Sequence, residues 1–173
     1  MLEFRKIEEK EFDEFYEVLE EAFPFVERKT KQNAYLDFKN MNNFMPCFIV
    51  LNGEKVGIIS YWIFDDFVFA EHLAIKKDLR NKKLGAEFFP NFLKSFNLPV
   101  LFEVEKPYDD LSLRRVNFYK RLGVIFNDFL YFQPSYHRED DKVPMIIASF
   151  PKALSLNQFD KFISVVKKYV YKI

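Results

Sequence analysis

The fold is decided by the stretch FVFAEHLAI-KKDLRNKK-LGAEFFPNFLKSF, which spans residues 67–96. Its first part is an apolar run interrupted only by Glu71 and His72, which predicts a buried strand. Its middle part is a charged turn. After Gly85, apolar residues recur at spacings of three and four, which predicts a helix with one apolar face. The stretch therefore predicts a strand, a basic turn and a helix.

A basic turn before a helix N-terminus forms a candidate anion-binding site. The first four amides of a helix have no intrahelical partner, and the helix dipole adds positive potential there. Gly85 would let the backbone approach a phosphate closely. Four cations add to the field: Lys77, Arg80, Lys82 and Lys83. An ordinary strand–helix connection with a solvated loop is the alternative interpretation.

The same residues resemble the acetyl-CoA-binding motif of the GCN5-related N-acetyltransferase (GNAT) family. That motif runs Arg/Gln-x-x-Gly-x-Gly/Ala after a hydrophobic strand. Arg80 matches its first position and Gly85 its last, whereas Lys83 stands in place of its first glycine. The resemblance implies that amides of the turn hold the CoA pyrophosphate and that the strand end pairs with the pantetheine arm. The cofactor contacts implied are Leu73, Ala74, Ile75, Arg80, Asn81, Lys82, Lys83, Leu84, Gly85 and Ala86.

Residues 117–123, NFYKRLG, resemble the second GNAT motif, commonly Phe-Tyr-x-x-x-Gly-Phe. The family often has Asn seven residues before the tyrosine. Ser112 stands there and is a further candidate cofactor contact. The resemblance covers about residues 1–150. It implies an α/β fold with a mixed, largely antiparallel central sheet, flanking helices and a splay between the fourth and fifth strands.

The remaining elements follow from the same periodicities. Helices are predicted over residues 9–23, 31–41, 111–123 and 154–169. Strands are predicted over residues 2–7, 44–51, 55–64, 100–105, 124–133 and 143–150. Thr30 can cap the second helix, and Asn52-Gly53 predicts a hairpin because both turn positions need positive φ. Pro90 predicts a kink or a short first segment in its helix. The inward positions expected in the helix over 111–123 are Leu111, Phe118 and Leu122.

Composition bounds the class of protein. A chain of 173 residues, 49% apolar and 30% charged, predicts one globular domain, with an appended C-terminal helix at about residues 154–171. Because 26 basic residues balance 26 acidic ones, we expect no broad nucleic-acid or membrane surface. Cys47 lies in an apolar run, which indicates a buried, inert thiol, and one Cys with two His predicts no metal site. A charged N-terminus without a long apolar run predicts a cytoplasmic protein.

Acetyl transfer to an amine needs a base for the ammonium proton and an acid for the leaving thiolate. Tyr119 is the candidate acid, because the resemblance places this tyrosine near the sulfur. Glu71 is the candidate base if it lines a cleft; alternatively it pairs with a cation. Glu103 and Glu105 share a face of the next strand. They are alternative candidate bases, groups that attract a cationic acceptor, or ion-pair partners of nearby arginines. His72, on the opposite face from Glu71, is interpreted as a core histidine.

The resemblance implies an N-acetyltransferase that moves an acetyl group from acetyl-CoA to a primary amine by direct attack. It places Tyr131 and Gln133 near the acceptor and makes the loop over residues 24–29 a candidate specificity element. The alternatives are a non-catalytic CoA-binding sensor or partner module with the same fold, and a nucleotide-phosphate-binding protein. The final helix packs on the domain or, as a minor alternative, forms a homodimer contact.

Overall fold

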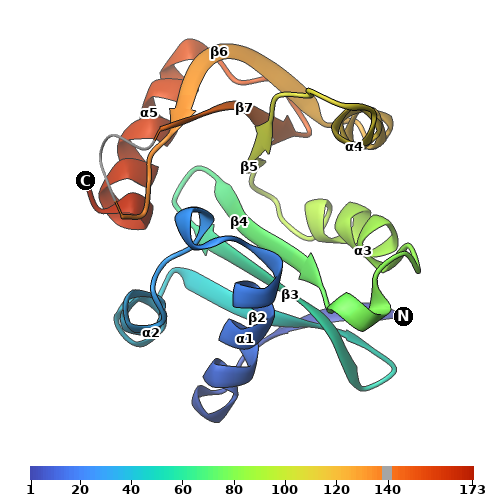
Figure 1. Ribbon diagram of the computed structural model, residues 1–173. Coiled ribbons are helices and arrows are strands. Elements are labelled where there is room, and N and C mark those ends of the chain that lie inside the picture. The colour runs from blue at the N-terminus through green and yellow to red at the C-terminus, as the bar shows by residue number, and fades with distance from the viewer. Residues whose placement is uncertain (138–141) are drawn as a thin grey trace. The chain divides into compact units, whose positions relative to one another are not determined.

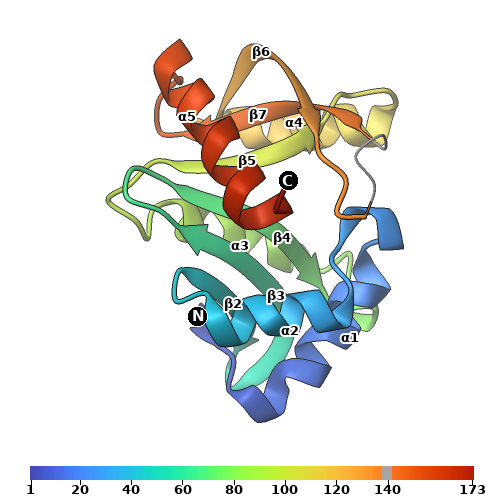
Figure 2. The same ribbon diagram turned by 90° about the vertical axis from the view of Figure 1, so that its left-hand side faces the viewer.

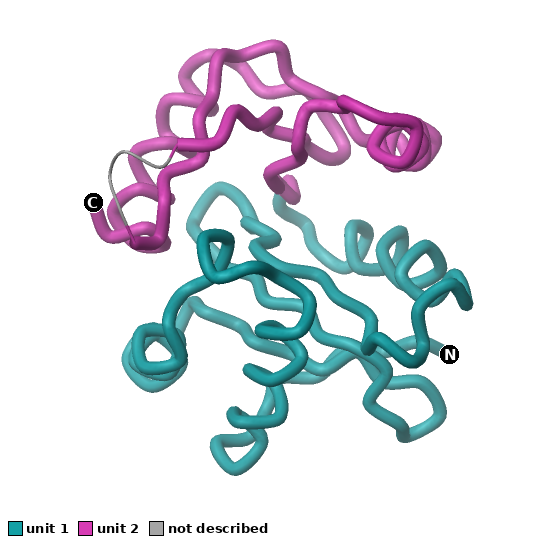
Figure 3. Tube along the Cα trace, viewed as in Figure 1, with its two compact units in different colours: residues 1–98 teal, residues 99–173 magenta. Residues whose placement is uncertain are grey.

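The computed structural model describes residues 1–137 and 142–173 (Figure 1). The chain forms two compact units, residues 1–98 and residues 99–173, which Figure 3 colours separately. Each unit has its own strands and helices. In the described part of the chain, no helix has both the length and the apolar character needed to cross a membrane.

The first unit contains four antiparallel strands in the order β1-β2-β3-β4. Their bounds are Leu2–Lys6 for β1, Phe44–Leu51 for β2, Glu54–Ile63 for β3 and Val68–Ile75 for β4. Between β2 and β3, Asn52 and Gly53 have φ values of 52° and 87°, so the predicted hairpin is confirmed. The strands predicted in this half of the chain are all present.

Helices cover both faces of this four-stranded sheet (Figures 1 and 2). Helix α1 (Phe12–Ala22) packs on the face that carries Phe48 and Ile58. Helix α3 (Leu84–Leu93) packs its phenylalanines against Phe4 and Tyr61 on the opposite face. The remaining elements are helix α2 (Lys31–Asn40) and the short 3₁₀ turns Glu9–Glu11, Phe25–Glu27 and Lys77–Leu79.

Two predictions about these helices have clear outcomes. Thr30 caps α2, since its hydroxyl accepts a hydrogen bond from the amide of Asn33 at 3.2 Å. Helix α3 continues through Pro90 and ends at Leu93, so the helical run is shorter than the apolar pattern predicted. Phe96 lies beyond the helix end, yet its ring still contacts those of Tyr61 and Phe92. Apolar periodicity therefore identified the packed residues correctly but overestimated the length of the helix.

The second unit contains three antiparallel strands in the order β5-β7-β6. Its elements are β5 (Val100–Glu105), α4 (Asp110–Arg121), β6 (Ile125–Gln133), β7 (Val143–Phe150), α5 (Leu156–Val166) and a π-helical turn (Lys167–Tyr171). The predicted fold class is confirmed: an α/β protein whose strands are largely antiparallel and flanked by helices.

The inward face of α4 differs from the prediction. Leu111 was expected to point inward but is 66% exposed, whereas Ser112 and Val116 are buried. The physical reason is the start of the helix: Asp109 caps it and forms a reciprocal capping box with Ser112. Ser112 and Val116, four residues apart, then form the buried stripe.

Candidate functional site

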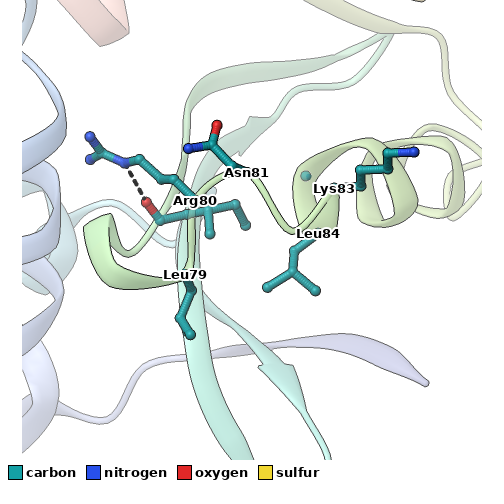
Figure 4. Close-up of a pocket in the computed structure, with 7 residues that line it drawn as sticks. Leu79, Arg80, Asn81, Lys83 and Leu84 are labelled. Atoms are coloured by element: carbon teal, nitrogen blue, oxygen red, sulfur yellow. Dashed lines mark hydrogen bonds between the residues drawn. The ribbon is translucent and has the colours of Figure 1, made fainter.

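A pocket of about 390 Å³ lies where β4 ends and the turn leads into α3 (Figure 4). It is lined by Ile75, Leu79, Arg80, Asn81, Lys83, Leu84 and Gly85. Six of these seven residues are predicted cofactor contacts, and only Leu79 was missed. Leu79 is the one apolar residue within the charged turn, and this feature of the sequence could have identified it. Four other predicted contacts of this stretch do not line the pocket: Leu73, Ala74, Lys82 and Ala86.

Arg80 is fixed beside the pocket by a hydrogen bond to the end of β4. Its Nε atom donates to the carbonyl oxygen of Ile75 at 3.1 Å (Figure 4). The bond closes the charged turn and holds the Arg80 side chain against the end of β4. A cation held in this way suits a phosphate ligand, because less side-chain entropy is lost on binding.

Gly85 is not required by packing within the protein. A Cβ atom added there would lie 3.6 Å from Cγ1 of Ile75, which is an ordinary van der Waals contact. Gly57 differs, because a Cβ atom there would lie 2.4 Å from the carbonyl oxygen of Ala74. Gly57 is therefore needed for close strand packing, whereas Gly85 leaves space in the pocket wall itself.

Glu71 lies at a β-bulge in β4. Ser60 of β3 pairs with His72 and Tyr61 pairs with Ala70, which leaves Glu71 as the extra residue. Its Oε2 accepts a hydrogen bond from Nε1 of Trp62 at 2.7 Å, and its side chain is only 3% exposed. Bulges redirect side chains and often occur beside active sites.

Glu71 also pairs with a cation, which was the second of its two predicted alternatives. The Nζ atom of Lys29 lies 3.6 Å from Oε1 of Glu71 and 2.6 Å from Oδ2 of Asp37. The same ammonium lies 4.7 Å from the centre of the Trp62 ring. Asp37 is completely buried. Lys29 thus anchors the loop over residues 24–29, the candidate specificity element, within unit 1.

His72 is a buried core histidine, as predicted. Its Nε2 donates to the carbonyl oxygen of Glu27 at 2.9 Å, so Nδ1 accepts from the Ser60 hydroxyl at 3.3 Å. Burial lowers the pKa of His72, which keeps the ring neutral. Its role is to tie the same loop to β4.

Tyr119 projects from α4 into an aromatic environment within unit 2. Its ring lies 5.2 Å from that of Phe102, edge-on, and also contacts the rings of Phe118 and Phe126. Burial raises the pKa of Tyr119 above its usual value. The hydroxyl therefore keeps its proton at neutral pH, as a proton donor must.

A second polar cluster lies in unit 2 and is centred on Glu103. Its carboxylate accepts hydrogen bonds from the hydroxyls of Tyr131 and Tyr171 and from the side-chain amide of Gln133. Tyr131 and Gln133 were predicted near the acceptor; Tyr171 was missed. Its only signal was its place just after the final apolar run. Glu105, two residues after Glu103 on the same strand, is half-buried.

The remaining predictions concern thiol and metal chemistry. Cys47 is buried, and burial raises the pKa of its thiol to about 12, so it is an inert core residue as predicted. Across residues 1–137 and 142–173, no three His, Cys, Asp or Glu side chains lie close enough together to hold a metal ion.

Comparison with known proteins decides the family. The model of the acetyltransferase (GNAT) family matches residues 12–124. The chain belongs to the GNAT family. The predicted resemblance is thereby confirmed.

Two proteins named as acetyltransferases are similar over different extents. The chain is 33% identical over 110 residues to YjbC of Bacillus subtilis (strain 168). That region is 62% of this chain and 54% of YjbC, so the chain spans about half the length of this curated relative. A solved structure from Bacteroides thetaiotaomicron, named as a GNAT-family acetyltransferase, is 27% identical with a TM-score of 0.91 and covers 99% of each chain.

A solved aminoglycoside 6'-N-acetyltransferase in complex with coenzyme A is also similar. It is 13% identical, with a TM-score of 0.57, over 85% of this chain and 95% of that one. At this identity the likeness concerns the fold alone.

Lys83 and Ser112 depart from the GNAT motifs, and the structure accounts for both. Lys83 has φ 59° and precedes α3 in the left-handed conformation that glycine adopts most easily. The Ser112 hydroxyl accepts from the amides of Tyr108 and Asp109 at 3.0 and 3.1 Å and donates to Asp109. Lys83 therefore has a backbone conformation that favours glycine, whereas the Ser112 hydroxyl is used within its own turn.

Proposed function

We propose that this GNAT protein transfers an acetyl group from acetyl-CoA to a primary amine by direct attack. The observation that carries the proposal is the pocket at the start of α3. It combines two cationic side chains, a helix N-terminus and a glycine that packing does not require. A structural neighbour solved with coenzyme A supports the choice of cofactor.

The pocket residues suit the phosphates of CoA. The amides of Leu84 and Gly85 lie in the first turn of α3, and the Lys83 side chain does not cap that turn. Arg80 and Lys83 would contribute positive charge, with Asn81, Lys82 and Ala86 in the same turn. The backbone of Leu73, Ala74 and Ile75 would hold the pantetheine arm. Ser112 is the weakest of the proposed contacts, because its hydroxyl already has three partners.

In the proposed reaction, the neutral amine nitrogen attacks the thioester carbonyl carbon, a C–N bond forms and the C–S bond breaks. A carboxylate takes the proton that the amine loses, and Tyr119 gives a proton to the leaving thiolate. Glu71 is the proposed base: the bulge of β4 presents its carboxylate, which Trp62 and Lys29 hold in place. Glu103 and Glu105 are the alternative bases.

The first test is calorimetric titration with acetyl-CoA and, separately, with ATP. We expect saturable binding of acetyl-CoA and much weaker binding of ATP. Acetyl-CoA at 100 times its dissociation constant should stabilise the fold by about 2.7 kcal/mol. Absence of acetyl-CoA binding would overturn the proposal.

Matched variants locate the binding site and separate catalysis from sensing. Arg80→Gln should weaken acetyl-CoA binding about tenfold, whereas Lys94→Gln, at the other end of α3, should not. A thiol-release assay over a panel of amines then tests transfer. Binding without thiol release on any amine would instead support the sensor alternative.

A further inference from the structure

Asp37 is a buried carboxylate that the proposed reaction does not use. It lies in α2 and is completely buried, and its Oδ2 accepts a hydrogen bond from Nζ of Lys29 at 2.6 Å. The same ammonium lies 3.6 Å from Oε1 of Glu71, the proposed base. Two carboxylates from different elements therefore share one ammonium, and Asp37 holds it the more closely.

The ammonium of Lys29 is fixed in this shared position. Its side chain is only 9% exposed, and Nζ lies 4.7 Å from the centre of the Trp62 ring. Trp62 also donates a hydrogen bond from Nε1 to Oε2 of Glu71 at 2.7 Å. Thr30, the residue after Lys29, caps α2, the helix that carries Asp37. The loop that supplies the ammonium and the helix that supplies the second carboxylate are thus joined directly.

The effect of each neighbour on Glu71 follows from its charge. An ammonium favours the ionised form of a nearby carboxylate and so makes it a weaker base, whereas a second carboxylate has the opposite effect. Both effects are strong here, because burial lowers the effective dielectric constant. The ammonium lies nearer to Asp37 than to Glu71, so it compensates the charge of Asp37 the more strongly. Lys29 can therefore hold Glu71 in place without making it too weak a base.

His72 is a further titratable group whose charge reaches Glu71. Burial lowers the pKa of His72, an effect that the charge of Glu71 partly opposes. The ring therefore stays neutral above about pH 6.5. Because a protonated ring would place a second cation beside Glu71, the contribution of His72 is separated from that of Asp37 by a variant of its own.

We propose that Asp37 is a positioning residue of the acetyl-transfer reaction: by holding Lys29, it fixes how strongly the ammonium acts on the base Glu71. The inference rests on the proposed function, in which Glu71 takes the proton that the amine loses. A general base is most effective when its proton affinity matches the working pH. Asp37 thus sets the pH range of the reaction from α2, a helix outside both GNAT motifs.

The pH dependence of thiol release tests this role. Asp37→Asn keeps the side-chain shape and an oxygen acceptor for Lys29 but removes the charge. The acidic limb of kcat/KM should then move to lower pH by about one unit, because Glu71 ionises more easily. Lys29→Gln removes the ammonium and should move the same limb to higher pH. A merely structural role of the pair would not move the limb in opposite directions.

A second measurement follows the ionisation of Glu71 without turnover. The full chain is labelled with glutamate carrying ¹³C at Cδ, and the resonance that is lost in Glu71→Gln is followed by NMR through a pH titration. Its midpoint should fall in Asp37→Asn and rise in Lys29→Gln. Asp13→Asn is the matched control and should leave the midpoint unchanged, because the ion pair of Asp13 with Lys31 is largely exposed. An unmoved midpoint in Asp37→Asn overturns the inference.

Each substitution decides the question by itself if the other does not fold. An unmoved midpoint in folded Lys29→Gln also overturns the inference, because the ammonium is the link between Asp37 and Glu71. His72→Gln should leave the acidic limb in place, and loss of the limb in this variant would assign it to the histidine and overturn the inference.

The two measurements distinguish this inference from the proposed function. If no amine supports thiol release while the Glu71 midpoint moves as stated, the proposed function fails and the coupling of Asp37 to Glu71 stands. If thiol release occurs and neither the limb nor the midpoint moves in Asp37→Asn, the proposed function stands and the role of Asp37 is overturned.

Discussion

The buried Nζ atom of Lys29 lies 3.6 Å from Oε1 of Glu71. This relationship ties the loop after α1 to the bulge in β4, and Asp37 of α2 shares the same ammonium at 2.6 Å. A cation and two carboxylates buried together are stable only while they compensate one another.

Lys29→Met should destabilise the first unit strongly. It leaves the buried carboxylates of Asp37 and Glu71 without their shared ammonium, and breaking a buried ion pair costs about 3 to 5 kcal/mol. Urea unfolding followed by circular dichroism measures the loss. Lys31→Met is the control, because its ion pair with Asp13 is largely exposed and should contribute little. Equal effects of the two substitutions would show that the buried cluster contributes no more to stability than an exposed ion pair does.

Gly85→Ala should separate stability from cofactor binding. The added Cβ makes only an ordinary contact with Ile75, and alanine favours helix. The free energy of unfolding should therefore be unchanged or rise by up to about 1 kcal/mol. Acetyl-CoA affinity, measured by calorimetry, should fall about tenfold because the methyl group occupies the pocket wall. Gly53→Ala is the opposite control: at φ 87° it strains the hairpin but leaves affinity unchanged. Unchanged affinity in Gly85→Ala would contradict the assigned site.

Lys83→Gly should relieve backbone strain at the start of α3. A non-glycine residue in the left-handed region costs about 1 to 2 kcal/mol, part of which is offset because glycine is more flexible when unfolded. The expected result is a small rise in thermal stability together with weaker, less salt-dependent acetyl-CoA binding, since one pocket cation is lost. Lys83→Met, which removes the charge but keeps the strain, should weaken binding without the gain in stability. A fall in stability of Lys83→Gly would refute the strain argument.

His72 should make stability depend on pH just below neutrality. Burial lowers its pKa in the folded chain, so the unfolded chain binds the proton more readily. The free energy of unfolding is therefore fully retained above about pH 6.5, the usual pKa of histidine, and falls as pH drops below it. The slope contributed by His72 should reach at most about 1.4 kcal/mol per pH unit. His72→Gln should lower stability at all pH values but flatten this slope; an unchanged slope would assign it to another group.

Tyr119→Phe should slow acetyl transfer while leaving acetyl-CoA affinity nearly unchanged. The hydroxyl is proposed to protonate the thiolate, and loss of one general acid costs about 10²- to 10⁴-fold in rate. The ring packing against Phe102 is kept, so the unfolding transition should hardly move. Tyr108→Phe, on the exposed loop before α4, serves as the control and should retain full kcat. Full activity of Tyr119→Phe would remove this residue from the mechanism.

Much of the fold could be predicted because its signals are local. Apolar runs and alternation located the strands, Asn52-Gly53 marked the hairpin by its need for positive φ, and Thr30 marked the start of α2. Six of the seven pocket residues were predicted for the same reason: strand, turn and helix N-terminus are contiguous in the chain. The error at Leu111 arose because the capping box, not the apolar pattern, sets which face of α4 is buried.

By itself, the sequence determined the order of strands and helices, the GNAT motifs and the cationic turn, because periodicity and turn chemistry depend on near neighbours. Only the tertiary structure decided what the isolated carboxylates contact. It brought Lys29 to Glu71 through the bulge in β4, and Tyr171 to Glu103 across 68 residues of chain. Such pairs depend on how distant segments pack, and a buried charge takes whichever partner that packing supplies.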